Sequence, residues 1–247
     1  MAENNQEKSA EPLIDSPSRQ FARQQIRKMS EVDQWEATEL DALKIIHPGI
    51  KNRELLNSFR ELRTQLMQKT GGKNAVCLVS AVCKGGGGSF VSLNLAATIA
   101  LDISKTALLI DCNLYEPSVE RLMRVTPDYG LTDYLEDVNL DVQDIIYSAG
   151  IPRLRVIPVG CNTEAGAEHF ISARMGDFIE AVRARYPDRF IIIDAPPVGL
   201  AAETRILANY CDVALLVVPY GRVTPQQIQA GIDTVGKDKV AGLVFND

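Results

Sequence analysis

A run of four glycines between an apolar segment and a helical pattern constrains the fold of this chain more than any other feature. Residues 76–80 form the apolar segment, the glycines are 85–88, and Ser89 opens a stretch to residue 102 in which apolar residues recur at helical spacing. Glycines let backbone N–H groups turn inward, and the N-terminus of a helix adds a positive dipole. Strand, glycine loop and helix in this order therefore predict a cradle for phosphate.

The loop lacks the lysine that such cradles usually carry. In the common form, GxxxxGK[ST], the lysine contacts the β- and γ-phosphates and the hydroxyl binds Mg²⁺. Here Ser89 supplies the hydroxyl, but Gly88 stands in the lysine position. A dinucleotide-binding loop is one alternative, and it fits poorly because its pattern needs a small residue where Phe90 or Val91 stands. A purely structural glycine turn is the other alternative, at a high cost in conformational entropy.

Apolar runs alternate with helical patterns from residue 71 to the end of the chain. The runs are continuous rather than alternating, as expected for parallel strands covered by helices on both faces. We therefore predict a three-layer α/β fold with a mostly parallel sheet. Strands are expected at 76–80, 106–110, 154–158, 190–193, 212–218 and 240–245. Helices are expected at 51–69, 89–102, 118–124, around 131–148, 170–186, 201–209 and 224–236.

The N-terminal part divides into two further segments. Residues 1–18 are polar and are expected to be disordered, residues 19–70 form an N-terminal arm and an amphipathic helix, and residues 71–247 form the P-loop NTPase-like domain. Phe21, Ile26, Met29, Trp35 and Leu40 are possible anchors of the arm, and Leu55, Phe59, Leu62 and Leu66 share one face of the helix.

Charge and hydropathy exclude two classes of function. The net charge of −6 argues against nucleic acid as the main partner, because neutralising phosphates requires a basic surface. No apolar run reaches the roughly 20 residues that a membrane-spanning helix needs, and the polar N-terminus does not resemble a signal peptide. We therefore expect a cytoplasmic protein whose link to any membrane runs through a partner.

Two aspartates end predicted strands. Asp111 follows 106–110, and Asp194 follows 190–193. Ligands of parallel sheets bind at the carboxyl ends of strands, so both carboxylates are expected to lie near the glycine loop. The structural alternative is that they cap turns at the strand ends.

Several stretches together resemble the bacterial tyrosine kinases (BY-kinases) of the MinD/ParA-like superfamily. The resemblance covers about residues 50–247. It is carried by the loop KGGGGS at 84–89, NSFRELR at 57–63, LLIDCNLYEPS at 108–118, GLTDYL at 130–135, VIPVG at 156–160 and IIIDAPP at 191–197.

The resemblance implies ATP or ADP with Mg²⁺ as cofactors. It assigns nucleotide contacts to Lys84, Gly85, Gly86, Gly87, Gly88, Ser89, Phe90 and Asn246, and metal contacts to Ser89, Asp111 and Asp194. Asp111 and Lys84 would take part in catalysis, with Lys84 reaching a phosphate. Arg60 and Arg63 would join copies of the chain into a homo-oligomer, unless they only form a solvated helix face.

The chain departs from the family pattern mainly at positions that would bind nucleotide or metal or take part in catalysis. Gly88 replaces the loop lysine, Asn113 the second motif aspartate, Tyr115 the motif arginine, and Asn57 a glutamate. The seven tyrosines are scattered rather than clustered at the C-terminal end. We therefore expect turnover to be weak or lost while nucleotide binding survives more readily.

Three functions are compatible with these residues. The first is a catalytically impaired regulatory subunit of exopolysaccharide or capsule synthesis and export, docked on an integral-membrane, Wzz-like polysaccharide co-polymerase. The second is an active protein-tyrosine autokinase or ATPase in which Lys84 compensates for Gly88. The third is a ParA/MinD-type positioning ATPase, for which neither a basic surface nor a terminal amphipathic helix is visible.

Overall fold

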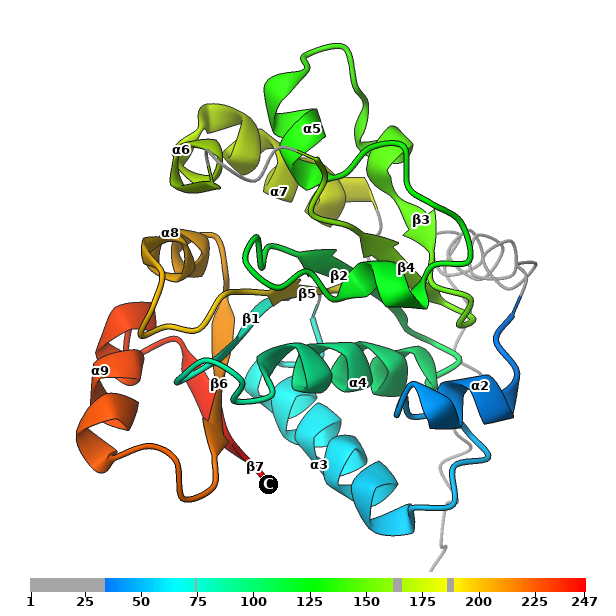
Figure 1. Cartoon of the computed structure of the whole chain (residues 1–247), viewed down its shortest axis with the longest axis vertical. Coiled ribbons are helices and arrows are strands. Elements are labelled where there is room, and N and C mark those ends of the chain that lie inside the picture. The colour runs from blue at the N-terminus through cyan, green and yellow to red at the C-terminus, as the bar shows by residue number, and fades with distance from the viewer. Residues whose placement is uncertain (1–33, 74, 162–165, 186–188) are drawn as a thin grey trace, which may run out of the picture.

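A computed structural model describes residues 34–73, 75–161, 166–185 and 189–247 (Figure 1). The predicted disorder of residues 1–18 lies outside the described residues, as do the possible anchors Phe21, Ile26 and Met29. Within the described ranges, no helix has both the length and the apolar character needed to span a bilayer.

The core of the fold is a seven-stranded sheet in the order β3-β4-β2-β5-β1-β6-β7. All neighbouring strands are parallel except β3, which pairs antiparallel with β4 at one edge. The predicted mostly parallel sheet is confirmed. The strands are β1 Val76–Ala81, β2 Thr106–Asp111, β3 Tyr147–Ser148, β4 Leu154–Ile157, β5 Arg189–Asp194, β6 Val213–Pro219 and β7 Val240–Asn246.

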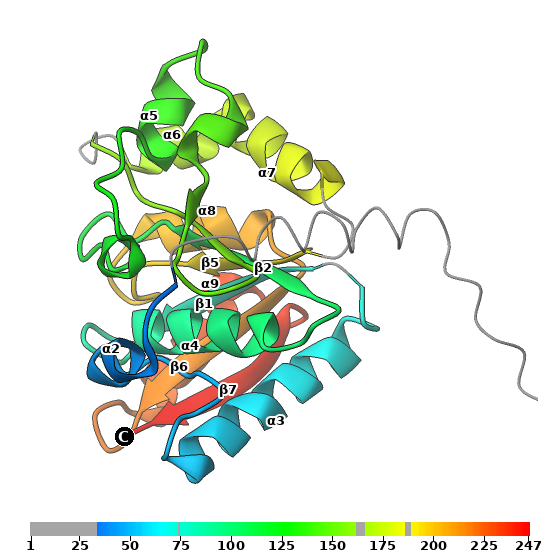
Figure 2. The same ribbon diagram turned by 90° about the vertical axis from the view of Figure 1, so that its right-hand side faces the viewer.

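Helices cover both faces of this sheet, which confirms the three-layer architecture (Figures 1 and 2). One face packs against α2 Ala37–Ala42, α3 Arg53–Lys69 and α4 Gly88–Ala100. The other packs against α5 Leu131–Glu136, α6 Gly166–Ile171, α7 Ala173–Arg185, α8 Ala202–Asn209 and α9 Pro225–Val235. Because β1, β2, β5 and β6 are buried on both faces, they consist of the continuous apolar runs seen in the sequence.

Helix α4 is the central helix of its layer. Residues 91–100 are all buried, because the sheet covers one side of the helix and α3 covers the other. The predicted amphipathic face of α3 makes this contact: Phe59 and Leu66 are buried, Leu55 and Leu62 are partly buried, and Leu56 joins them. The N-terminus of α4 is thereby fixed at the end of β1.

Two predicted helices are interrupted. The expected helix around 131–148 ends at Glu136, and a 3₁₀ helix, η2 (Val142–Ile145), and the edge strand β3 follow. The carboxylate of Asp137 accepts a hydrogen bond from the Asn139 N–H at 2.9 Å, and such local bonds compete with a helix. The expected helix 170–186 is two helices, because the Ser172 hydroxyl bonds to backbone groups of both.

The predicted helix 118–124 is a single 3₁₀ turn, η1 (Val119–Leu122). It begins where the carboxylate of Asp111 accepts the N–H groups of Ser118 and Val119, at 2.7 and 3.0 Å. Because a side chain from β2 binds the start of η1, this turn is attached directly to the end of the sheet.

The described part of the N-terminal arm packs against the α/β domain. Trp35 donates its indole N–H to the carbonyls of Leu122 and Ala149, at 3.1 and 3.0 Å. The buried amide of Asn94 in α4 accepts the Ile46 N–H at 2.8 Å and donates to the Lys44 carbonyl at 3.1 Å. The predicted anchors Trp35 and Leu40 therefore both contact the core.

The buried amide of Asn94 gives a stability prediction. Asn94→Ala leaves the Ile46 N–H without its acceptor in the interior and opens a small cavity, so we expect a loss of about 2–4 kcal/mol in the free energy of unfolding. Chemical denaturation measures this loss. Asn57→Ala, at an exposed position of α3, is the matched control and should change stability by less than about 0.5 kcal/mol. Equal effects in the two variants would contradict the proposed attachment of the arm.

Candidate functional site

The glycine loop connects β1 to the first turn of α4 in the shape expected for a phosphate cradle. Gly85 and Gly87 adopt left-handed conformations with φ of 65° and 88°, which favour glycine. Gly87 is the N-cap of α4, so the backbone of Gly88, Ser89 and Phe90 forms the first helical turn. The N–H groups of such a turn have no partner inside the helix and are available to an anion.

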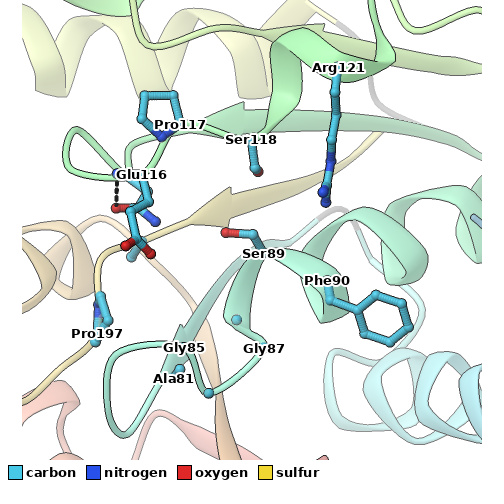
Figure 3. A pocket seen from close by; sticks show the side chains of 14 residues that line it. Ala81, Gly85, Gly87, Ser89, Phe90, Glu116, Pro117, Ser118, Arg121 and Pro197 are labelled. Carbon is cyan, nitrogen blue, oxygen red and sulfur yellow. Dashed lines mark hydrogen bonds between the residues drawn. The ribbon is translucent and has the colours of Figure 1, made fainter. Parts of the chain in front are cut away.

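A cavity of about 440 Å³ opens over this loop (Figure 3). One wall is formed by the loop and the start of α4, and the opposite wall by the segment that follows β2. Its described lining consists of Ala81, Gly85, Gly86, Gly87, Gly88, Ser89, Phe90, Asn113, Glu116, Pro117, Ser118, Arg121, Ala195 and Pro197. The structure thus brings the predicted loop residues together with a second segment that the motif analysis did not assign to phosphate binding.

The two predicted aspartates lie side by side at the strand ends. Asp111 of β2 is the register partner of Asp194 of β5, and their exposed fractions are 1% and 0%. The hydroxyls of Ser92 and Ser118 donate to Asp194 at 2.9 and 3.3 Å, and the Ser89 hydroxyl lies close enough to lower the pKa of this carboxyl group. Asp194 therefore lies beside Ser89, the predicted metal-binding hydroxyl.

Burial changes the protonation of both carboxyl groups. Loss of water, together with the negative charge of Asp194, raises the pKa of Asp111 to about 7 against the lowering effect of three backbone N–H bonds. Burial likewise raises the pKa of Asp194 to about 6, although the hydroxyl donors and the charge of Arg121 oppose the rise. The pair thus favours a nearby cation at neutral pH.

Asp111 also caps the turn at the end of its strand, which was the structural alternative for this residue. Its Oδ1 accepts the Asn113 N–H at 3.0 Å, and its Oδ2 accepts the N–H groups of Ser118 and Val119. The carboxylate therefore shapes the loop between β2 and η1. Its predicted contact with metal or with the attacking hydroxyl stays a prediction.

Lys84 lies at the rim of the site rather than in the cavity lining. Its ammonium forms an ion pair with Glu116 at 2.9 Å, and this hydrogen bond and charge raise the pKa of Lys84. The loop backbone beside it is held by Arg222, which donates to the carbonyls of Gly85 and Lys84 at 2.8 and 3.1 Å. Neither Glu116 nor Arg222 was singled out from the sequence, because both contacts form between distant segments.

Asn246 and Phe90 support the loop from the side of β7 and α3. The Asn246 amide donates to the Gly86 carbonyl at 3.4 Å and lies against Gly87, where a Cβ would collide with it. The ring of Phe90 meets that of Phe59 edge-on at 6.1 Å, and this contact joins the first turn of α4 to α3. The nucleotide contacts predicted for these two residues stay predictions.

The predicted oligomer residues differ in their surroundings. Arg63 donates to the Thr98 carbonyl of α4 at 3.2 Å, whereas Arg60 is exposed. Arg63 thus has a role inside the chain, and the oligomer contact predicted for both residues stays a prediction.

The residues present fit a magnesium nucleotide. Among the described residues, no cluster of three or more His, Cys, Asp or Glu side chains is arranged to hold a metal by itself. Mg²⁺ in nucleotide sites commonly uses one or two protein oxygens together with phosphate oxygens and water. Ser89 and Asp194 can supply such oxygens beside the phosphate cradle.

Sequence comparison identifies bacterial tyrosine kinases, although no family model matches the chain. The tyrosine-protein kinase CpsD of Streptococcus agalactiae serotype III is 32% identical over 191 residues, which cover 76% of this chain and 80% of CpsD. The putative tyrosine-protein kinase EpsB of Ralstonia solanacearum is 31% identical over 195 residues, which cover 77% of this chain and 25% of EpsB.

Comparison of structures finds the same fold in kinases and in MinD. The kinase domain of the Escherichia coli tyrosine kinase ETK matches with a TM-score of 0.71 at 24% identity, over 77% of this chain and 74% of that one. The chimerical protein CapA2B2 matches with a TM-score of 0.72 at 20% identity, over 92% and 98%. MinD of Pyrococcus horikoshii, complexed with Mg-ADP, matches at 0.55 and 20% identity, over 70% and 68%. The fold is therefore the P-loop fold of the MinD type.

The buried carboxylate pair predicts how stability varies with pH in the nucleotide-free protein. Because the folded-state pKa values of Asp111 and Asp194 lie above the unfolded value near 4, the folded state binds more protons between about pH 4 and 7. The pair therefore destabilises the fold increasingly as pH rises through this window. Asp194→Asn should raise Tm by roughly 3–6 °C at pH 8 and by much less at pH 5.

Thermal melts from pH 5 to pH 8 measure this difference. Asp177→Asn, at an exposed position of α7, is the matched control and should leave the pH dependence unchanged. If Asp194→Asn lowered Tm equally at both pH values, the carboxylate would be a stabilising partner rather than a strained one.

Proposed function

The chain belongs to the bacterial tyrosine-protein kinase family that includes CpsD, and we propose that it is a nucleotide-binding member with slow phosphoryl transfer. In this proposal it binds ATP or ADP with Mg²⁺ at the glycine loop. It serves as a regulatory subunit of capsule or exopolysaccharide synthesis and export.

The charge balance of the loop is the observation that carries the proposal. Phosphoryl transfer depends on positioning and on neutralising charge at the terminal phosphates. Gly88 provides no cation, and Lys84 is paired with Glu116 at the rim. The loss of one preorganised charge typically reduces the rate by about 10²–10³-fold. The cradle of backbone N–H groups, Ser89 and Asp194 remains, and this supports binding more than turnover.

Each remaining residue has a defined task in this proposal. The N–H groups of the first turn of α4 hold phosphate oxygens, and the Ser89 hydroxyl provides a ligand for Mg²⁺. Bound Mg²⁺ would neutralise phosphate charge beside the two aspartates. Asp194, which lies beside the Ser89 hydroxyl, would orient it, and Asp111 keeps the facing wall of the cavity in place.

We place the protein at the cytoplasmic side of the inner membrane through a partner. The partner would be an integral-membrane, Wzz-like polysaccharide co-polymerase, and a homo-oligomer would involve Arg60 and Arg63. Family membership supports this, and the close fold match to the chimerical CapA2B2 is compatible with it. Co-sedimentation with membranes that contain or lack such a co-polymerase tests the placement. Equal sedimentation with both membranes would contradict it.

An active autokinase or ATPase is the second candidate. Lys84 favours it, because its ammonium lies at the cavity rim and is held only by an exposed ion pair, which is worth little in water. Lys84→Ala distinguishes the two functions in an assay of tyrosine phosphorylation and ATP hydrolysis. A large loss of a substantial wild-type activity would support the active enzyme, whereas a low activity that Lys84→Ala leaves unchanged supports the regulatory subunit.

Restoring the loop lysine provides the main test. A Cβ at Gly88 would lie 3.1 Å from the Ala81 backbone nitrogen, so the loop has to shift by a few tenths of an ångström to accept a side chain. We expect Gly88→Lys to bind Mg-ATP about 10-fold more tightly and to raise turnover by about 10²-fold or more. Titration calorimetry and steady-state hydrolysis measure the two effects.

Gln68→Lys adds the same charge at an exposed position of α3 and serves as the control. Wild-type turnover equal to that of Gly88→Lys would contradict slow phosphoryl transfer. Absence of nucleotide binding by the wild type would contradict the proposal that the protein binds nucleotide at all.

A further inference from the structure

Arg121 lies in the wall of the cavity that faces the glycine loop. It belongs to the 3₁₀ turn η1 and lines the cavity together with Ser118 and Asn113. Figure 3 shows its side chain extending from η1 into the space above Ser89 and Phe90. An anion bound at the first turn of α4 would therefore lie between the loop and this guanidinium.

Two contacts fix the turn that carries Arg121. At its start, the Asp111 carboxylate accepts the Ser118 and Val119 N–H groups. At its end, the Leu122 carbonyl accepts the indole N–H of Trp35 at 3.1 Å. The position of Arg121 is thus determined both by the end of β2 and by the N-terminal arm. This arrangement reduces the entropy that ordering the side chain on a ligand would cost.

The charges around the cavity leave Arg121 available. It is the only cationic residue among the described residues that line the cavity, and no hydrogen bond or ion pair joins its guanidinium to another described residue. Lys84 is paired with Glu116. Burial raises the pKa of Asp194, and the positive charge of Arg121 opposes that rise, so its field already reaches the carboxylate beside Ser89.

We propose that Arg121 replaces the missing loop lysine and binds the terminal phosphates of the nucleotide from the opposite wall of the cavity. A guanidinium is permanently charged and can donate two parallel hydrogen bonds to phosphate oxygens. The inference rests on the nucleotide-binding function proposed above, and it names the residue that supplies the charge absent at Gly88.

Nucleotides of different length test this role in the full chain. We expect Arg121→Gln to weaken Mg-ATP binding by about 10- to 100-fold, as for the loss of a charge-assisted hydrogen bond. The affinity for AMP should change less than about 2-fold, because AMP has no terminal phosphates for Arg121 to bind. Titration calorimetry with Mg-ATP, Mg-ADP and AMP measures the pattern. Arg121→Lys keeps the charge but loses the two parallel hydrogen-bond donors of the guanidinium. Its affinity for Mg-ATP should therefore lie between those of the wild type and Arg121→Gln.

Two comparisons make the test specific. Arg205→Gln removes the same charge from an exposed position of α8 and should leave every affinity unchanged. Adding Gly88→Lys to Arg121→Gln should restore most of the lost Mg-ATP affinity, because the charge returns from the loop side. Circular dichroism and thermal melts verify that each variant is folded.

The outcomes separate this inference from the proposed function. If the wild type binds Mg-ATP and Arg121→Gln binds it equally well, the role of Arg121 is wrong while the nucleotide site stands. If Arg121→Gln weakens the binding of AMP as much as that of Mg-ATP, the residue acts elsewhere than at the terminal phosphates, and the inference also fails. If the wild type binds no nucleotide, the proposed function fails and this inference fails with it.

Discussion

Two buried carboxylates at neighbouring strand ends determine the arrangement of everything around them. Asp111 and Asp194 are register partners on β2 and β5 and have almost no contact with water. Burial without compensation would be costly, so each is surrounded by donors. Three backbone N–H groups bind Asp111 and thereby start η1, whereas the hydroxyls of Ser92 and Ser118 bind Asp194 and connect it to α4 and to the start of η1. The same interactions that make the pair tolerable build both walls of the cavity.

The cavity differs from an ordinary P-loop in where its positive charge lies. The loop wall carries dipoles but no cation, since Gly88 stands where a lysine is usual and Lys84 is paired with Glu116 at the rim. The charge comes from the facing wall, on Arg121. A cation approaching from this wall can hold bound phosphates without occupying the position from which a loop lysine assists transfer. Strong binding and slow turnover are therefore compatible in one site.

The sequence predicts the architecture well because its signals are local. Continuous apolar runs identify the six parallel strands, and the glycines before Ser89 identify the start of α4. The predicted helix 131–148 is wrong beyond Glu136, because side-chain bonds of Asp137 and Asp141 favour turns and the edge of the sheet takes up residues 147–148. The pairing of Lys84 with Glu116 and the placement of Arg121 depend on how distant segments meet, which no local pattern encodes.

Hydrogen exchange of the full chain with and without Mg-ATP is the sharpest test of nucleotide binding between the two walls of the cavity, because it locates the nucleotide as well as detecting it. We expect slower exchange at the amides of residues 85–90, which form the cradle, and in the segment 113–121, which carries Arg121 on the facing wall. AMP should protect the segment 113–121 much less than Mg-ATP does. If saturating Mg-ATP left both segments unchanged, or protected only a surface distant from the glycine loop, this account of the site would be contradicted.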